Sequence, residues 1–388
     1  MRIVMLVSKR TDPRTFNEAY TLVNAGHDVT IVTWDREVRF PKKQEVIEGY
    51  KMHRIQFKGT YGRGIGQIPG FARFWFVAFL RLMRWKYDVV YCHDLDTYPV
   101  GWLAARLRRK KVVFDAHIPL PERMAWKELE SPMTRYFVRF IEMIERLLAK
   151  RADVVFTDSE KVVERFRGMG VKNVYEILNV PRRDFLYTPK VHRDGPVTIG
   201  RIGLMSRIIG HGADDTIDAF ERLLEEGHDV RLALLGNITP DEYKEELTER
   251  IRRLGDRVTF SDFIPYKEVM NWYGKLDISV ILYDHRIHRC MYRLGYPVKL
   301  FESMAAGLPM ILRSNAHAQQ LLLDKECGIV VGHELENVVS GLRTLIEDPE
   351  LRTRYGANAR RAFEERYNWA YESQRLLKAL EPILSAHQ

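Results

Sequence analysis

Residues 278–313, ISVILYDHRIHRCMYRLGYPVKLFESMAAGLPMILR, contain the pattern that decides the fold. Two short β-branched runs, 278–283 and 310–313, have the length and composition of buried strands. A helix is expected to start at Pro297 and to end before Gly307, because proline suits the first helical turn and glycine the position after the last. A strand, a helix and a second strand in this order predict two parallel strands joined by a crossover helix.

The same alternation runs through the whole chain. In the first half, strands are expected at 2–7, 28–33, 88–92, 111–115 and 153–157, with helices near 14–25, 97–108 and 134–150. A second series has strands at 197–203, 229–235, 257–260, 278–283, 310–313 and 328–331, with helices near 213–226, 241–254, 266–275, 297–306 and 335–347. The sequence therefore predicts an α/β protein with two doubly wound, Rossmann-like domains.

A polar stretch that contains prolines, 179–195, interrupts the alternation and is expected to link the two domains. We expect an N-terminal domain at 1–182, a C-terminal domain at 183–366, and a helix at 367–388 that crosses back to the N-terminal domain. With 388 residues, 46% of them hydrophobic, the chain is long enough for two cores of ordinary size.

Charge and cysteine content restrict the class of protein. The net charge of +9 is spread along the chain without a basic tail, which favours anionic ligands or a membrane surface over nucleic acid. Cys92, Cys290 and Cys327 are far apart, so we expect buried, reduced thiols. No apolar run reaches the roughly 20 residues that span a bilayer, and the N-terminal run is too short for a signal peptide. A cytoplasmic protein is expected.

The helix expected at 297–306 should lie at a ligand site. Loops at the carboxyl ends of parallel strands form the ligand crevice of an open α/β sheet, and a helix N-terminus favours a phosphate. Lys299 adds a positive charge, and the Glu302 carboxylate can accept hydrogen bonds from the two hydroxyls of a ribose. The alternative is that Lys299 and Glu302, three residues apart, pair on a solvated helix face.

A second candidate site is the glycine-rich stretch GRIGLMSRIIGHG at 200–212. Arg201 and Arg207 in such a loop suit a diphosphate, because each guanidinium can bind phosphate oxygens bidentately and stays charged. The alternative is a solvated basic loop. The two stretches together are more specific for a nucleotide than either one alone.

Further short motifs follow in order along nearly the whole chain. They are DPRTFNEAYTLVNAGHDVTIVT (12–33), VVYCHDLDTYPVGWLAA and VVFDAH (89–117), TDSE (157–160), ILNVPRRDF (177–185), GR with Arg207 (200–207), PVKLFESMAAGLP (297–309), CGIVV (327–331) and YNW (367–369). In this order and spacing the chain resembles the GT-B-fold glycosyltransferases of family 4, a retaining family that uses nucleotide-sugar donors.

The resemblance implies a hexosyltransferase-like enzyme that moves a sugar from a nucleoside diphosphate sugar to an acceptor hydroxyl of a glycan, polysaccharide or glycolipid. The catalytic residues that it implies are His117, Arg201 and Arg207. Donor contacts are implied for Arg201, Arg207, Phe263, Ile264, Lys299, Leu300 and Glu302, and acceptor-side contacts for Arg10, Arg14, His93 and Asp94. It implies neither a cofactor besides the donor nor a metal, because charged side chains stabilise the leaving diphosphate. For His117, the alternative is a hydrogen-bonded structural histidine.

Two positions depart from the family pattern. Leu294 replaces a glutamate that usually contacts the donor sugar, and Arg207 replaces the usual lysine. A non-catalytic sugar-nucleotide-binding protein and a nucleotide-sugar epimerase of the same fold therefore stay open as alternatives. The histidines and Cys290 of DHRIHRC (284–290) match no strong zinc-ligand spacing, so a loop that faces donor or acceptor is favoured there.

The segment FARFWFVAFLRLMRWKY, residues 71–87, combines arginines with many aromatic residues. On a helix, Arg73, Arg81 and Arg84 fall within an arc of about 80°, which leaves a broad aromatic face. The segment is expected either to contact anionic lipid at the inner face of the cell membrane, which suits a lipid-linked acceptor, or to pack in the core with its arginines in water.

Overall fold

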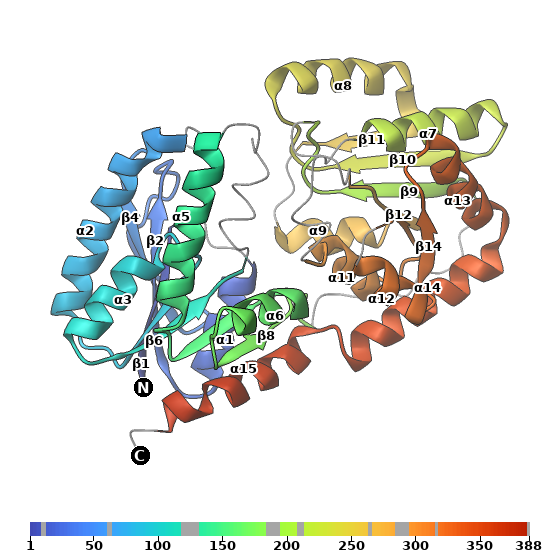
Figure 1. The fold of residues 1–388 in the computed structure, drawn as a ribbon. Coiled ribbons are helices and arrows are strands. Elements are labelled where there is room, and N and C mark those ends of the chain that lie inside the picture. The colour runs from blue at the N-terminus through green and yellow to red at the C-terminus, as the bar shows by residue number, and fades with distance from the viewer. Residues whose placement is uncertain are drawn as a thin grey trace. The chain divides into compact units, whose positions relative to one another are not determined.

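The computed structural model describes residues 1–8, 13–59, 64–117, 132–183, 195–207, 213–262, 266–283, 295–314 and 317–385. The chain divides into two compact units (Figure 1). The first unit comprises Met1–Asn179 with Ala370–Gln388, and the second comprises Val180–Trp369. Each unit contains one sheet flanked by helices, which confirms the predicted fold of two doubly wound α/β domains.

The sheet of the first unit has eight strands in the order β3-β4-β2-β1-β5-β6-β7-β8. The strands are β1 (Arg2–Val7), β2 (Asp28–Asp35), β3 (Gln44–Ile47), β4 (Tyr50–Gln56), β5 (Val89–His93), β6 (Lys111–Asp115), β7 (Val154–Thr157) and β8 (Val174–Glu176). All neighbouring strands are parallel except β3 and β4. The central strand β1 is buried over its last five residues, as a strand covered on both faces should be.

The hairpin β3–β4 was not predicted from the sequence. Its two-residue turn is Glu48-Gly49, and both residues have positive φ angles, of 45° and 89°. Such turns usually carry Asn-Gly or Asp-Gly, so Glu48 weakens the sequence signal. The short edge strand β8 was not predicted either.

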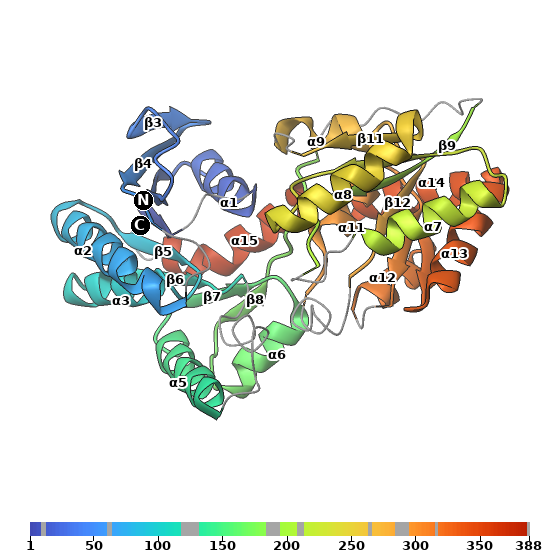
Figure 2. The same ribbon diagram turned by 90° about the horizontal axis from the view of Figure 1, so that it is seen from above.

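The helices of the first unit are α1 (Pro13–Asn24), α2 (Ile68–Arg84), α3 (Tyr98–Leu107), α5 (Pro132–Ala149), α6 (Glu160–Gly168) and α15 (Trp369–Leu384), with a short 3-10 turn at Gly64–Gln67. The crossovers through α2, α3, α5 and α6 all advance in one direction along the sheet, and the crossover through α1 advances in the other. Right-handed crossovers therefore place α1 on one face and the other four on the opposite face (Figure 2). The C-terminal helix α15 contacts this unit through Glu372, which accepts a hydrogen bond from the Leu178 N–H at 3.2 Å.

The sheet of the second unit has six parallel strands in the order β11-β10-β9-β12-β13-β14. They are β9 (Val197–Ile202), β10 (Val230–Leu235), β11 (Val258–Ser261), β12 (Ile278–Ile281), β13 (Met310–Arg313) and β14 (Gly328–Val331). The helices are α7 (Asp214–Glu225), α8 (Asp241–Arg253), α9 (Tyr266–Tyr273), α11 (Val298–Ala305), α12 (Ala318–Asp324), α13 (Leu335–Glu347) and α14 (Pro349–Glu365), with a 3-10 turn at Gly255–Arg257.

Within residues 278–313, the described parts, 278–283 and 295–313, fold as predicted. Strand β12 leads to α11 and then to β13, and Ser279 pairs with Met310 in parallel register. Pro297 caps the start of α11, and Gly307 follows its end with a φ of 63°. The strand order changes direction between β9 and β12, and the carboxyl ends of strands at such a switch point form the usual ligand site.

Two of the three cysteines, Cys92 and Cys327, are buried free thiols, as expected, and Cys290 lies outside the described residues. Within the described ranges, no helix combines the length and the hydrophobicity that a membrane-crossing segment requires.

Candidate functional site

Two cationic side chains of the second unit come together beside the carboxyl end of β9. Arg201, in β9, is 2% exposed, and its guanidinium donates to the Leu204 carbonyl at 3.4 Å. Lys299 lies in the first turn of α11. Burial, reinforced by the charge of Arg201, lowers the pKa of Lys299 to about 7. Burial also lowers the pKa of Arg201. A buried and a half-buried positive group that repel each other form a place where an anion is stabilised.

Two glycines make room for the Lys299 ammonium group. A Cβ atom on Gly203, directly after β9, would lie 2.3 Å from Lys299 Cε and 2.8 Å from Nζ. Gly203 has a φ of 108°, which side chains rarely tolerate. Gly236, directly after β10, has a φ of 135°, and a Cβ there would lie 2.4 Å from the Gly203 carbonyl oxygen. The lysine therefore lies against the backbone of the loop that follows β9.

Glu302 is buried one helical turn beyond Lys299. Its carboxylate accepts a hydrogen bond from the Tyr273 hydroxyl at 3.0 Å. Burial raises the pKa of Glu302, and the Tyr273 hydrogen bond and the Lys299 charge oppose this shift. The alternative of a solvated Lys299–Glu302 pair is wrong, because Glu302 is only 7% exposed. The next predicted donor residue, Leu300, is fully buried, so its side chain packs in the core.

Arg207 differs from Arg201 in its surroundings. Its side chain is 47% exposed and pairs with Asp214 at 2.9 Å and with Glu246 at 2.5 Å. Its guanidinium also lies 4.5 Å from the centre of the Tyr243 ring. The hydrogen bonds to the two carboxylates raise the pKa of Arg207. Of the remaining donor candidates, Phe263 and Ile264 lie outside the described residues, as do Leu294 and the DHRIHRC stretch.

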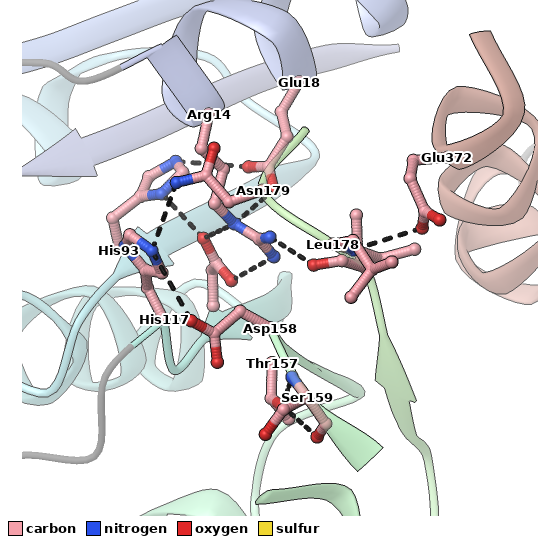
Figure 3. A network of polar contacts seen from close by, with 12 residues as sticks. Arg14, Glu18, His93, His117, Thr157, Asp158, Ser159, Leu178, Asn179 and Glu372 are labelled. Carbon is pink, nitrogen blue, oxygen red and sulfur yellow. Dashed lines mark hydrogen bonds and ion pairs between the residues drawn. The ribbon is translucent and has the colours of Figure 1, made fainter. Parts of the chain in front are cut away.

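The first unit contains a buried network of charged side chains at the carboxyl ends of β5 and β6 (Figure 3). Arg14 is completely buried and bonds Asp115 at 2.8 and 3.0 Å. It also lies 3.1 Å from Glu18, one turn further along α1. His93 Nδ1 lies 3.0 Å from Asp115, and its Nε2 lies 3.7 Å from Glu18. Arg14 further donates to the carbonyl of Ile177, which precedes Leu178.

The two buried carboxylates of this network differ in their acidity. Burial, together with the Asp115 charge, raises the pKa of Glu18 to about 7. Burial also acts to raise the pKa of Asp115, but the charges of Arg14 and His93 hold it well below its usual range. The pKa of Arg14 lies well above its ordinary value, since the two carboxylates outweigh its burial. Asp115 therefore keeps its charge at neutral pH, whereas the pKa of Glu18 is itself close to neutral pH.

His117 lies at the edge of the network, two residues after β6. Its Nε2 atom is 3.8 Å from the Asp158 carboxylate and 3.4 Å from the Asn179 side-chain nitrogen (Figure 3). Burial raises the pKa of Asp158 to about 6, opposed by the charges of His117 and Arg14. The His117 side chain is 15% exposed. It thus has the polar contacts that a structural histidine needs and an exposed portion that a substrate-facing role needs.

The three acceptor-side candidates that the structure describes are buried. Arg14, His93 and Asp94 are each at most 5% exposed, and Asp94 has a φ of 63°. Arg14 and His93 come together in the network, and Arg10 lies outside the described residues. Sequence reasoning expected Gly203 to keep the loop after β9 open, and it assigned no role to the other members of either site, which are Glu18, Asp115, Asp158, Asn179, Tyr273 and Gly236. The spacing of Arg14 and Glu18 by four residues is the signal that could have found the first of these.

Glu18, His93 and Asp115 also form a set that could hold a metal ion, since one ligand atom from each lies within 4.8 Å of the others. The Arg14 guanidinium is bonded to both carboxylates of this set. It supplies the positive charge that a cation would otherwise bring.

Comparison with known proteins identifies the class. Residues 12–179 match the family model of the glycosyl transferase 4-like domain, and residues 202–362 match that of the glycosyl transferases group 1. Together these models span most of both units. The chain belongs to the GT-B glycosyltransferases of the family 4 type, as the sequence motifs predicted.

Individual relatives are distant. A GDP-mannose-dependent monoacylated alpha-(1-6)-phosphatidylinositol monomannoside mannosyltransferase of Corynebacterium glutamicum is 22% identical over 247 residues, which cover 61% of this chain and 64% of that relative. The solved sucrose-phosphate synthase of Thermosynechococcus elongatus has a TM-score of 0.78 at 17% identity and covers 100% of both chains. HepE of Anabaena in complex with UDP has a TM-score of 0.67 at 18% identity, covering 98% of this chain and 100% of that one. These structures share the fold.

Proposed function

We propose that the protein is a retaining glycosyltransferase that transfers a hexose from a nucleoside diphosphate sugar to an acceptor hydroxyl of a glycan or glycolipid. The observation that carries the proposal is the convergence of Arg201, Lys299 and Glu302. Burial and the charge of Arg201 lower the pKa of Lys299, and the charge of Lys299 opposes the rise that burial causes in the pKa of Glu302. The Lys299 side chain also lies against Gly203, two residues after Arg201. Two cations, Arg201 and Lys299, and one hydrogen-bond acceptor, Glu302, thus lie near one another at the switch point of the sheet.

The two cations suit the diphosphate of the donor. Arg201 can form parallel hydrogen bonds to phosphate oxygens, and Lys299 adds a point charge. When the glycosidic bond breaks, negative charge develops on the diphosphate, and buried cations stabilise it strongly. Arg207 already has two carboxylate partners, so we assign it a supporting role at the mouth of the loop. This chemistry requires neither an enzymatic nucleophile nor a metal ion.

Glu302 suits the ribose of the donor. An ionised carboxylate accepts hydrogen bonds from both vicinal hydroxyls, and Tyr273 holds one of its oxygens in place. Burial strengthens these bonds, because water does not compete for them. The name of the Corynebacterium relative specifies GDP-mannose, and HepE was solved in complex with UDP. Other proteins that resemble this chain therefore use a nucleotide sugar or bind a nucleoside diphosphate. The base and the sugar of this protein's donor are left to experiment.

In the first unit, we assign His117 to the reacting sugar and the acceptor. Its imidazole is partly exposed, unlike Arg14, Glu18, His93 and Asp115, and its polar contacts are Asp158 and Asn179. Arg14, Glu18, His93 and Asp115 hold the strand ends from which His117 extends, and so act as positioning residues. A phosphate-bearing or lipid-linked acceptor agrees with the net positive charge of the chain.

A screen of nucleotide sugars tests the proposal. Thermal shifts with UDP-, GDP-, ADP- and CMP-sugars identify the donor, and donor consumption with and without candidate acceptors identifies transfer. We expect one nucleotide class to raise the unfolding midpoint and Lys299→Met to abolish that shift. Binding without consumption of any donor would favour the alternative of a non-catalytic sugar-nucleotide-binding protein, which the leucine at position 294 keeps open.

A further inference from the structure

Exposed apolar side chains of the first unit are concentrated on helix α5. Five large hydrophobic residues of this helix are between 46% and 72% exposed: Tyr136, Phe137, Phe140, Met143 and Leu147. No other helix in the described ranges carries more than three such residues. Single exposed apolar residues are normal on protein surfaces, but a contiguous group on one element marks an interaction surface.

The five residues form one stripe along α5. At ~100° per residue they fall within an arc of about 120°. The opposite side of the helix attaches it to the unit, because Glu145 and Ala149 are buried there and the Leu148 carbonyl accepts a hydrogen bond from the Tyr98 hydroxyl at 3.1 Å. Figure 2 shows α5 at the outer edge of the first unit. The helix therefore presents its apolar stripe to solvent.

A row of basic residues runs beside this stripe. Arg135, Arg139 and Arg146 are all exposed and fall within an arc of about 40° that directly adjoins Met143. The acidic residues of α5, Glu142 and Glu145, lie 3.9 and 2.6 Å from Arg165 on α6. Within the described part of the chain, no carboxylate forms an ion pair with the three arginines of the row. The positive charges of this row are therefore not neutralised by carboxylates of the described residues, and they can interact with an external anionic surface.

Two other helices on this face of the sheet also expose apolar side chains. Helix α3, on the same face of the sheet, exposes Leu103 and Leu107. For helix α2, the sequence left open a contact with lipid or packing in the core. Phe74 is fully buried against Trp34, with ring centres 5.9 Å apart, and the Trp75 indole donates to the Asp96 carbonyl at 2.6 Å. Most of the aromatic face expected at 71–87 is thus used for packing, and Phe76 is its strongly exposed member.

We propose that α5 is the surface by which this protein docks on an anionic lipid bilayer. An apolar aromatic stripe beside a basic row is the geometry of a helix that lies in the plane of the membrane interface. The stripe enters the boundary between headgroups and acyl chains, and Arg135, Arg139 and Arg146 meet the lipid phosphates. A second copy of the helix is a poorer occupant, because its own carboxylates are engaged with Arg165. The surface lies outside the donor site, so the inference does not depend on the proposed function.

Vesicle co-sedimentation of the full chain tests this surface. We expect binding to vesicles of phosphatidylcholine with phosphatidylglycerol, weaker binding to phosphatidylcholine alone, and release as salt rises from about 0.1 M to about 1 M. Phe140→Ser with Leu147→Ser should lower the partition coefficient roughly tenfold or more, because two apolar side chains leave the interface. The matched control is Leu323→Ser with Leu335→Ser, two exposed leucines of the second unit, which should bind like wild type.

Charge is tested separately. Arg139→Glu with Arg146→Glu should abolish the preference for anionic vesicles, and Lys42→Glu with Lys43→Glu, an exposed basic pair of the same unit, should change it far less. All four changed pairs lie on the surface, so circular dichroism should show an unchanged fold. The proposal is overturned if wild type ignores anionic vesicles, or if the α5 variants bind as well as their controls. A third outcome would replace the proposal with a dimer interface. In that outcome, wild type binds no lipid but self-associates in light scattering, and Phe140→Ser with Leu147→Ser abolishes this self-association.

Discussion

The ammonium group of Lys299 occupies the space in which any residue other than glycine at position 203 would carry its side chain. A Cβ on Gly203 would approach Lys299 Nζ to 2.8 Å and Cε to 2.3 Å. Gly203, directly after β9, and the first turn of α11 therefore pack closely around one half-buried cation. This fit links the glycine-rich stretch of the sequence to the helix that carries Glu302.

Gly203→Ala should displace the Lys299 ammonium and weaken nucleoside diphosphate binding roughly tenfold or more, because one of two phosphate-binding cations moves. The matched control is Gly227→Ala. Gly227 also has a positive φ, of 85°, but no atom lies within 4 Å of its Cβ position. Both variants should lose about 1–2 kcal/mol of stability from the left-handed conformation. Calorimetry should show a loss of affinity for Gly203→Ala alone, and equal affinities in the two variants would contradict the fit.

Nucleoside diphosphate affinity should fall as pH rises from 7.5 to 9. The pKa of Lys299 is lowered to about 7 in the free protein, so above that pH the lysine must take up a proton to bind an anion. The fall can reach about tenfold per pH unit for one proton. In this range the phosphates are already fully ionised, since their second pKa is about 6. Lys299→Met should bind more weakly and without this pH dependence. A wild-type affinity that is constant or rises would refute the assignment.

Arg14→Met should strongly destabilise the first unit. The substitution leaves the Asp115 charge and Glu18 buried without their guanidinium, and breaking a buried ion pair in this way costs about 3–5 kcal/mol. Arg167→Met, which removes an exposed pair with Glu160 in the same unit, should cost at most about 1 kcal/mol. Thermal unfolding followed by circular dichroism measures both. Similar midpoints for the two variants would show that the network contributes little to stability.

The unfolding midpoint of the first unit should decrease as pH rises from 5 to 7. The pKa of Glu18 is raised from 4.5 to about 7 in the folded protein, so the native state binds more protons than the unfolded chain in this window. Stability is therefore lost with rising pH, by up to about 1.4 kcal/mol per pH unit. Glu18→Gln should flatten this dependence. Asp158→Asn should flatten it only below pH 6, because the pKa of Asp158 is raised to about 6. A midpoint that rises with pH in wild type would contradict these shifts.

Most of the fold could be predicted because parallel strands buried on both faces are nearly continuous apolar runs. Strand β1 and the β12–α11–β13 unit are examples. The hairpin β3–β4 could not be predicted, since its turn relies on a glutamate at positive φ. The exposed stripe of α5 also escaped prediction. A periodic apolar pattern shows that a helix is amphipathic, but it does not show which side faces the protein.

The donor site was more predictable than the network of the first unit. Arg201 lies at the carboxyl end of β9, and Lys299 and Glu302 lie in the helix that follows β12. Because β9 and β12 flank the switch point of one sheet, topology alone brings these residues together. Arg14 was expected to contact an acceptor, and it is buried against Asp115, which lies 101 residues away in the chain. Such a pairing depends on which helix covers which strand end. One sequence does not contain that information in a local pattern.

The most direct test of the donor site is calorimetric titration of wild type, Arg201→Met and Glu302→Gln with a nucleoside diphosphate and with pyrophosphate. The nucleotide is the one selected in the donor screen. The account predicts that Arg201→Met weakens binding of both ligands, and that Glu302→Gln weakens binding of the nucleoside diphosphate but leaves pyrophosphate unchanged. Affinities equal to wild type in both variants, with the fold intact, would contradict it.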